Sequence, residues 1–365
     1  MARYIVAGVP RSLGPGGAGK RLEWAEPARR GRREREARRA IGYPPPVILP
    51  GLLKRGDVVR IVAPASPFDP DLLAKGLAVL RDGMGLVPRY RDDLLARRRY
   101  LAGDDARRLE EWREAVSDPD ARAIFCARGG YGTMRILPRI DPAPLLVHPK
   151  VLVGFSDLTA LHAVLNRAGL ATVHGPVLTQ LGRATPQAVE HLSALLTRAP
   201  APAPSGSPAR GAGLTGRATV RPGRADGPLL GGSLTLLAHL CGTPFLPGLR
   251  GAILALEDVD ERPYRLDRYL TQLRLAGALE GLAGVALGQF SNCDDQEVRG
   301  LEVVREWAAE LAVPVAEGFA FGHEDGNLAF PLGARATLVA PGPGEPGPAR
   351  MLFGGWAERA GEARA

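Results

Sequence analysis

The sequence has little of what marks a secreted, membrane or zinc-binding protein. Its three cysteines, Cys126, Cys241 and Cys293, are odd in number and far apart, so they predict neither a disulfide framework nor a cysteine-bound metal. No apolar run approaches the ~20 residues that a membrane-spanning helix needs. The N-terminus also lacks the basic, apolar and small-residue order of a secretory signal. We therefore expect a cytoplasmic protein without a membrane partner.

Histidine is also scarce, with six residues in a chain of 365. No two of them have the H-E-x-x-H spacing or another spacing typical of metal ligands, so the sequence predicts no metal site. Nothing in the sequence indicates a bound cofactor either, and we expect none.

The net charge of +8 is concentrated at one end of the chain. Residues 1–46 hold eleven Lys or Arg and four Asp or Glu, a net of +7, which leaves about +1 for the rest. The basic residues are densest from Arg29 to Arg39. Such a run can bind a phosphate backbone, but it is more often a solvated extension. We therefore expect no nucleic-acid partner.

Length and composition indicate a soluble globular chain of two domains. Of its residues 45% are apolar and 24% are charged, and domains commonly hold about 100–200 residues. A stretch rich in Pro, Gly, Ala and Ser divides the chain in the manner of a linker. The predicted parts are a basic, disordered extension (1–46), an N-terminal domain (47–199), a linker (200–216), a C-terminal domain (217–356) and a tail (357–365).

Segments with strand patterns alternate with helical ones, which predicts an α/β fold with a largely parallel sheet. In such sheets ligands gather at the carboxyl ends of the strands, where both Ser156 and the glycine-rich turn 128–132 fall. Strands are expected at 57–65, 121–127, 151–155, 251–256, 285–290 and 334–339, and helices at 70–84, 157–168 and 265–276.

Ser156 lies in the stretch V-L-V-G-F-S-D-L-T-A-L, from Val151 to Leu161. An apolar run ends at Gly154 and a helical pattern begins after Asp157, so a tight strand-to-helix turn would hold the serine hydroxyl at its apex. That arrangement is typical of a nucleophile elbow, although Leu158 replaces the second glycine of G-x-S-x-G. A serine and an aspartate before a helix are also ordinary N-cap residues, and both interpretations stay open at this point.

A serine nucleophile needs a base, usually histidine, and a carboxylate that orients the base. His323 lies in a polar, glycine-bounded turn, F-G-H-E-D-G-N, and His174 ends a short strand in V-H-G-P. Glu257 directly follows an apolar strand, where it is expected to be partly buried, and a buried acid needs a partner such as His323. The acidic residues that follow Glu257 are expected to lie mostly in a solvated loop.

Five motifs together resemble the LD-carboxypeptidase family of serine peptidases. They occur in the family's order between about residues 57 and 339, with the family's large gaps, and the basic extension is not part of the pattern. The motifs are R-G-G-Y-G (128–132), G-F-S-D-L-T-A-L (154–161), G-P-L-L-G-G-S-L (227–234), L-E-D-V-D-E-R-P-Y-R-L-D-R (256–268) and G-H-E-D-G-N with a later P-L-G (322–333).

The resemblance implies a flavodoxin-like parallel sheet in the N-terminal domain, a smaller mixed α/β C-terminal domain, and an active site in the cleft between them. It also implies a catalytic triad of Ser156, His323 and Glu257, in which His323 takes the serine's proton and Glu257 orients the imidazole. The backbone N–H groups of Asp157 and Gly130 would then form the oxyanion hole.

The resemblance and the local pattern suggest roles for residues around these motifs. Arg128 and Arg262 are candidate anchors for the substrate's free carboxylate, because a guanidinium matches a carboxylate in a two-pronged way, but both are equally suited to structural salt bridges. The Asp157 side chain is expected to cap a helix, and Asn327 to support the histidine turn. Tyr131 fits either the cleft or the core.

The family's activity implies a hydrolase that cuts murein tetrapeptides between an L-configured diamino acid and a terminal D-alanine, during recycling of cell-wall peptidoglycan. The resemblance also implies a homodimer. An alternative within the family is an immunity peptidase that hydrolyses peptide–nucleotide antibiotic conjugates. The chain has no aromatic residue between His174 and Phe245 that could stack on a base, which favours cell-wall peptides. A non-catalytic ligand-binding module would be expected to lack a triad member, and all three are present.

Overall fold

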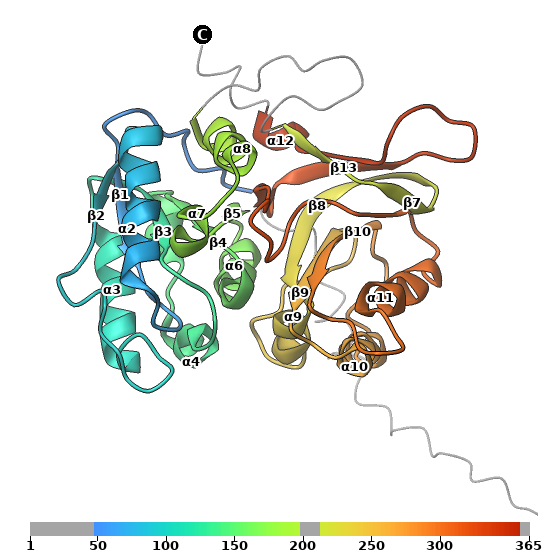
Figure 1. The fold of residues 1–365 in the computed structure, drawn as a ribbon, viewed down its shortest axis with the longest axis horizontal. Helices are drawn as coiled ribbons and strands as arrows, with labels where there is room; N and C mark the ends of the chain where they lie inside the picture. Colours follow the sequence, from blue (N-terminus) through green and yellow to red (C-terminus); the bar gives the residue numbers. More distant parts are fainter. Residues whose placement is uncertain (1–46, 198–211, 358–365) are drawn as a thin grey trace, which may run out of the picture. The chain divides into compact units, whose positions relative to one another are not determined.

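The computed structural model describes residues 47–197 and 212–357, which form two β-sheets with helices packed on them (Figure 1). The predicted basic extension lies outside the described residues, and so do most of the predicted linker and nearly all of the predicted tail. The predicted α/β class is confirmed.

The first sheet has the strand order β12-β5-β4-β3-β1-β2. Strands β1 to β5 run parallel to their neighbours, in the order of a flavodoxin-like sheet, as the resemblance implied. Apolar side chains fill β3 and β4 and are almost all buried, as a parallel sheet covered on both faces requires. The strands are β1 (Val58–Val62), β2 (Val87–Arg89), β3 (Ala121–Cys126), β4 (Val151–Gly154), β5 (Thr172–His174) and β12 (Phe330–Leu332).

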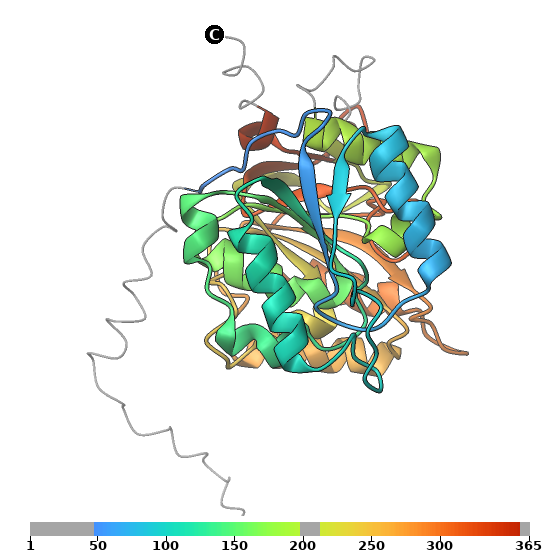
Figure 2. The same ribbon diagram turned by 90° about the vertical axis from the view of Figure 1, so that its left-hand side faces the viewer.

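Helices cover both faces of this sheet (Figure 2). Leu77 and Leu192 belong to one core layer, and Trp112 and Leu161 belong to the other. Successive side chains along a strand point to opposite faces of the sheet, so each strand contributes to both core layers. The helices are α2 (Pro70–Ala78), α3 (Asp105–Ser117), α4 (Thr133–Ile136), α5 (Ala143–Val147), α6 (Thr159–Arg167), α7 (Leu178–Leu181) and α8 (Pro186–Thr197), with the π-helix η1 (Val79–Gly83) and the 3-10 helices η2 (Leu137–Arg139) and η3 (Ser156–Leu158).

The second sheet is mixed, with the order β6-β14-β13-β8-β9-β10-β11-β7. Its central strands β8 to β11 are parallel, and antiparallel strands flank them. Leu237, Leu270 and Val304 of three helices pack in the core beneath this sheet. The elements are β6 (Gly213–Thr215), β7 (Ala218–Arg221), β8 (Gly223–Ser233), β9 (Ile253–Val259), β10 (Gly284–Ser291), β11 (Val315–Glu317), β13 (Arg335–Ala340), β14 (Arg350–Leu352), α9 (Leu234–Leu240), α10 (Pro263–Leu275), α11 (Gly300–Ala309) and α12 (Gly354–Ala357).

Each sheet includes a strand from outside the segment that was expected to supply it. Strand β12 comes from the C-terminal half, yet it pairs antiparallel with β5 at the edge of the first sheet. Strand β6 pairs with β14 in the second sheet, although its residues fall within the predicted linker. Ser233 N–H donates to the Thr159 hydroxyl at 3.1 Å, which ties the end of β8 to the start of α6. The halves therefore pack directly against each other beside β4.

Within the described ranges, no helix combines the length and the apolar character needed to cross a membrane.

Candidate active site

Ser156 occupies the tight turn between a strand and a helix. Strand β4 ends at Gly154, η3 begins at Ser156, and the serine backbone is left-handed with φ 65°. Residues other than glycine rarely adopt a positive φ, and this strain is the feature expected of a nucleophile elbow. Across the turn Gly129 lies so close that a Cβ there would sit 2.9 Å from the Ser156 Cβ. The structure therefore contains the turn that the local sequence predicted.

Ser156, His323 and Glu257 form one hydrogen-bonded line. His323 Nε2 lies 3.0 Å from Ser156 Oγ, and His323 Nδ1 lies 2.8 Å from Glu257 Oε2. Ser156 follows β4 of the first sheet, Glu257 lies in β9 of the second, and His323 is in the loop before β12. The structure thus brings together three residues that are distant in sequence, in the order that activates a hydroxyl as a nucleophile.

Burial and charge shift the pKa values of Glu257 and His323 in opposite directions. Glu257 is fully buried, which alone would raise its pKa, but His323 and His174 together outweigh burial and hold the pKa of Glu257 low. Burial alone would lower the pKa of His323, whereas the Glu257 carboxylate raises it above the ordinary value of 6.5. Each partner favours the charged form of the other, so an imidazolium at His323 would be held by an ionised acid.

Two further buried side chains interact electrostatically with Glu257. His174, which the sequence analysis singled out beside His323, has no exposed surface, and its Nε2 lies 3.8 Å from Glu257 Oε1. Asp258 is also buried and accepts hydrogen bonds from the Thr235 N–H at 2.7 Å and hydroxyl at 2.8 Å. Burial and the charge of Glu257 raise the pKa of Asp258 to about 7. The expected solvated position is therefore wrong for Asp258, because this residue lies within β9 and is covered by the start of α9.

Ser66 fixes the glycine turn that follows β3. Its N–H donates to the Gly129 carbonyl at 3.2 Å, and its hydroxyl accepts a bond from Tyr131 N–H at 3.0 Å. Gly130 between them has φ 102°, and a Cβ there would lie 2.5 Å from Ser66 Oγ. In the described part of the chain, the Gly130 N–H has no acceptor. Sequence reasoning missed Ser66, although a polar residue just after the parallel strand β1 carries the same positional signal as Ser156.

The Asp157 carboxylate holds the other end of the glycine turn. It is buried and accepts a hydrogen bond from Thr133 N–H, the first residue of α4, at 2.8 Å. Burial raises the pKa of Asp157 despite this bond. The expected cap of the helix that follows Asp157 is wrong, because the side chain binds the first N–H of α4 instead. The Asp157 side chain therefore ties the Ser156 turn to the glycine turn.

An open cleft of about 860 Å³ contains both Ser156 and His323. Arg128 lies on its wall, where Nη1 donates to the Pro67 carbonyl at 2.6 Å. Arg262 does not line the cleft; it is the residue before α10. The structure thus places one of the two candidate carboxylate anchors beside the serine. Tyr131 is likewise outside the lining, with half of its surface exposed.

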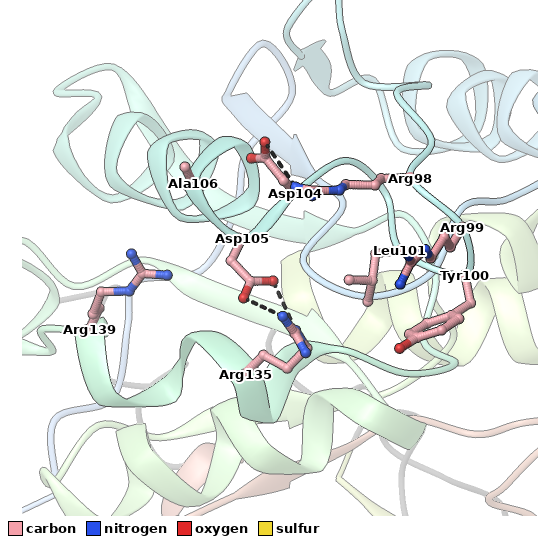
Figure 3. Close-up of a pocket in the computed structure, with 9 residues that line it drawn as sticks. All are labelled: Arg98, Arg99, Tyr100, Leu101, Asp104, Asp105, Ala106, Arg135 and Arg139. Atoms are coloured by element: carbon pink, nitrogen blue, oxygen red, sulfur yellow. Dashed lines mark hydrogen bonds and ion pairs between the residues drawn. The ribbon is translucent and has the colours of Figure 1, made fainter.

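A second hollow, of about 400 Å³, lies beside α3 and α4 (Figure 3). Four arginines border it and two of them face acids, since Arg135 pairs with Asp105 at 2.8 Å and Arg98 approaches Asp104 at 3.6 Å. None of the three residues of the hydrogen-bonded line borders it. Nowhere in residues 47–197 and 212–357 do three His, Cys, Asp or Glu side chains gather as metal ligands. The cleft is therefore the candidate active site.

Comparison with known proteins gives matches over most of the chain. Residues 59–175 match the model of the LD-carboxypeptidase N-terminal domain, and residues 226–338 match that of the LD-carboxypeptidase C-terminal domain. The chain is 43% identical, over 302 residues, to a Streptomyces coelicolor protein whose name is that of a carboxypeptidase; the match covers 80% of this chain and 94% of that protein.

Two further proteins have names that describe their substrates. The murein tetrapeptide carboxypeptidase of Pseudomonas aeruginosa is 38% identical over 292 residues, which cover 77% of this chain and 92% of that protein. The crystal structure of muramoyltetrapeptide carboxypeptidase from Oxalobacter formigenes superposes with a TM-score of 0.70 at 27% identity, over 80% of this chain and 97% of that one.

Proposed function

The chain belongs to the LD-carboxypeptidase family, and from this premise we propose that it is a serine carboxypeptidase of cell-wall recycling. Its substrate would be a murein tetrapeptide, cut between the L-centre of a diamino acid and the terminal D-alanine. The observation that carries the proposal is the line from Ser156 through His323 to Glu257 beside an open cleft. The relatives named for murein tetrapeptides support the substrate class.

In the first half of the proposed reaction, His323 acts as the general base. Glu257 accepts the hydrogen bond from Nδ1–H, which leaves Nε2 unprotonated and 3.0 Å from the Ser156 hydroxyl. Nε2 takes the hydroxyl proton as Oγ attacks the carbonyl carbon of the diamino acid residue. The carboxylate then stabilises the imidazolium that forms.

The carbonyl oxygen becomes an oxyanion as the serine bond forms. The N–H groups of Gly130 and Asp157 lie on the two turns that meet at Ser156, and we assign them as its donors. Losing one such donor typically costs about 3 kcal/mol of barrier. Collapse of the intermediate breaks the C–N bond, and His323 returns its proton to the amine of the departing D-alanine. Water then attacks the acyl-enzyme, again with His323 as base, and frees the shortened peptide.

A mass-spectrometric assay with murein stem peptides tests the proposal. We expect D-alanine release from tetrapeptides and none from tripeptides or pentapeptides, with lysine and diaminopimelate forms compared side by side. Ser156→Ala should abolish release while circular dichroism stays unchanged, and release that survives in this variant would remove the nucleophile assignment. Hydrolysis of a peptide–nucleotide conjugate without release from any murein peptide would favour the immunity function instead. Chelators should leave activity unchanged.

A further inference from the structure

His323 lies in a segment without regular secondary structure, between β11 and β12. Contacts from elsewhere must therefore fix where its imidazole points. Within the segment, Asn327 Oδ1 accepts a hydrogen bond from Gly322 N–H at 3.1 Å, as expected for a residue that supports the turn. This bond shapes the loop but does not attach it to the part of the molecule that carries Ser156.

Gln180, in α7, makes that attachment on both sides of His323. Its Nε2 donates to the Glu324 carbonyl at 3.0 Å and to the Gly322 carbonyl at 3.4 Å. Its Oε1 accepts a bond from Asn327 Nδ2 at 2.9 Å. Gln180 is 3% exposed and Asn327 is 0% exposed, so water cannot readily replace a hydrogen bond that either side chain loses.

We infer that Gln180 is a positioning residue for the general base, an inference that rests on the proposed role of His323. Gln180 comes from the half of the chain that supplies Ser156, and it binds the two peptide carbonyls that flank the imidazole of the other half. It thereby sets the 3.0 Å separation between His323 Nε2 and Ser156 Oγ. Gln180 touches the base's loop and not the base, so it acts through His323.

The same loop has a second, exposed attachment that serves as a matched control. Arg183 Nε lies 3.2 Å from Asp325 Oδ1, and about half of each side chain is exposed. Exposed ion pairs of this kind contribute little, because water and salt screen them. Asp325→Asn should therefore keep kcat within about twofold of wild type, although Asp325 is only two residues from His323.

Gln180→Glu tests the inference because its effect depends on pH. An ionised carboxyl at this position faces the Gly322 and Glu324 carbonyl oxygens without a proton to donate, whereas a protonated one donates again. Burial raises the pKa of such a carboxyl into the measurable range. We expect kcat about 10²-fold below wild type at about pH 8 with little change in KM, since misplacement by about 1 Å can cost that much. The ratio to wild type should rise about tenfold on acidification.

Gln180→Met separates the hydrogen bonds from packing, since it has a similar volume and no donor. The loss of kcat relative to wild type should be the same for this variant at every pH. A fluorophosphonate labels an activated Ser156, and intact-protein mass spectrometry follows the labelling, so serine activation is measured without a peptide substrate. The fraction of protein that becomes labelled also gives the amount of active enzyme by which kcat is normalised. Equal losses for the two variants at both pH values, or wild-type labelling rates in both, would overturn the inference.

The same measurements keep the inference separate from the proposed substrate. A wild-type protein that is labelled but releases no D-alanine would reject the substrate, while the labelling rates of the Gln180 variants still decide the inference. A wild-type protein that is not labelled at all would overturn both, because there would be no activated serine whose base needs positioning.

Discussion

His174 faces the second oxygen of the Glu257 carboxylate: its Nε2 lies 3.8 Å from Oε1, while Oε2 binds His323. In the described part of the chain, neither ring nitrogen of His174 has a hydrogen-bond partner, and the same is true of Glu257 Oε1. Phe330 stacks on the His174 ring with centroids 4.5 Å apart. The buried acid therefore lies between two imidazoles in apolar surroundings.

His174→Phe should lower kcat by about tenfold and leave KM nearly unchanged. The variant keeps the stack on Phe330 but removes the imidazole that faces Glu257 Oε1 and helps to hold the pKa of Glu257 low. The carboxylate would then hold His323 less firmly when the imidazolium forms. Steady-state kinetics on the tetrapeptide measure both constants.

Two amide variants show whether polarity or packing matters at this position. His174→Gln carries its amide nitrogen at the reach of Nε2, whereas His174→Asn carries it at the reach of Nδ1. We expect the Gln variant to retain more activity than the Asn variant. Equal losses in the two, or full activity in His174→Phe, would make His174 a packing residue only.

Glu257→Gln should move the pH dependence of kcat/KM toward acid. The charge of Glu257 raises the pKa of His323 above 6.5 against the lowering effect of burial, so removing the charge leaves burial opposed only by the smaller contributions of Asp258 and Asp260. His323 accepts a proton only in its neutral form, and the acid limb reports its pKa in the free enzyme. The limb should lie above pH 6.5 in the wild type and shift downward in the variant, while the plateau falls by about 10³-fold or more. A limb that stays in place would contradict the pairing.

Ser66→Ala should weaken binding of the transition state more than binding of the substrate. The variant leaves Tyr131 N–H without its acceptor and loosens the turn that carries Gly130, which keeps only the bond from the residue 66 N–H to the Gly129 carbonyl. We expect kcat to fall about tenfold at constant KM, with a parallel loss of affinity for a peptide boronate that forms a tetrahedral adduct with the serine. Ser66→Cys keeps a weak acceptor, so its kcat and its boronate affinity should lie between those of the wild type and of Ser66→Ala. Unchanged boronate affinity would show that the turn does not need Ser66.

The elements that the sequence predicted are those with local signals. The first sheet follows from apolar runs buried on both faces, and the Ser156 turn follows from glycine, serine and a helical pattern within a few residues. Strand β12 has three residues and takes its partner from the other half of the chain, so no local pattern marks it as part of the first sheet.

The site residues that escaped prediction depend on tertiary packing. Gln180 lies in an apolar helical segment, V-L-T-Q-L, and its partners come from a loop more than 140 residues away. Asp258 is buried because α9 covers it, which a run of four acids within five positions does not reveal. Arg262 shares a motif with Glu257, but the chain leaves the cleft before it reaches α10.

Arg128→Gln should raise KM for peptides that end in a free carboxylate. Arg128 is exposed on the wall of the cleft that holds Ser156, and its bond to the Pro67 carbonyl uses one of five N–H donors. A hydrogen bond to a charged group contributes about 1.5–3 kcal/mol, so KM should rise at least about tenfold. The kcat value should change little, because the carboxylate is held equally in the substrate complex and in the transition state.

Arg262→Gln is the matched control for this change, since it removes the same group outside the cleft and should leave KM within about twofold of wild type. The C-terminal amide of the tetrapeptide isolates the charge, and on this peptide Arg128→Gln and the wild type should differ little. If the two arginine variants behave alike, or if Arg128→Gln loses as much on the amide as on the acid, another group must bind the terminal carboxylate. Because Arg128 is exposed, its side chain can be shortened without opening the core, so a change in KM would not reflect a loss of stability.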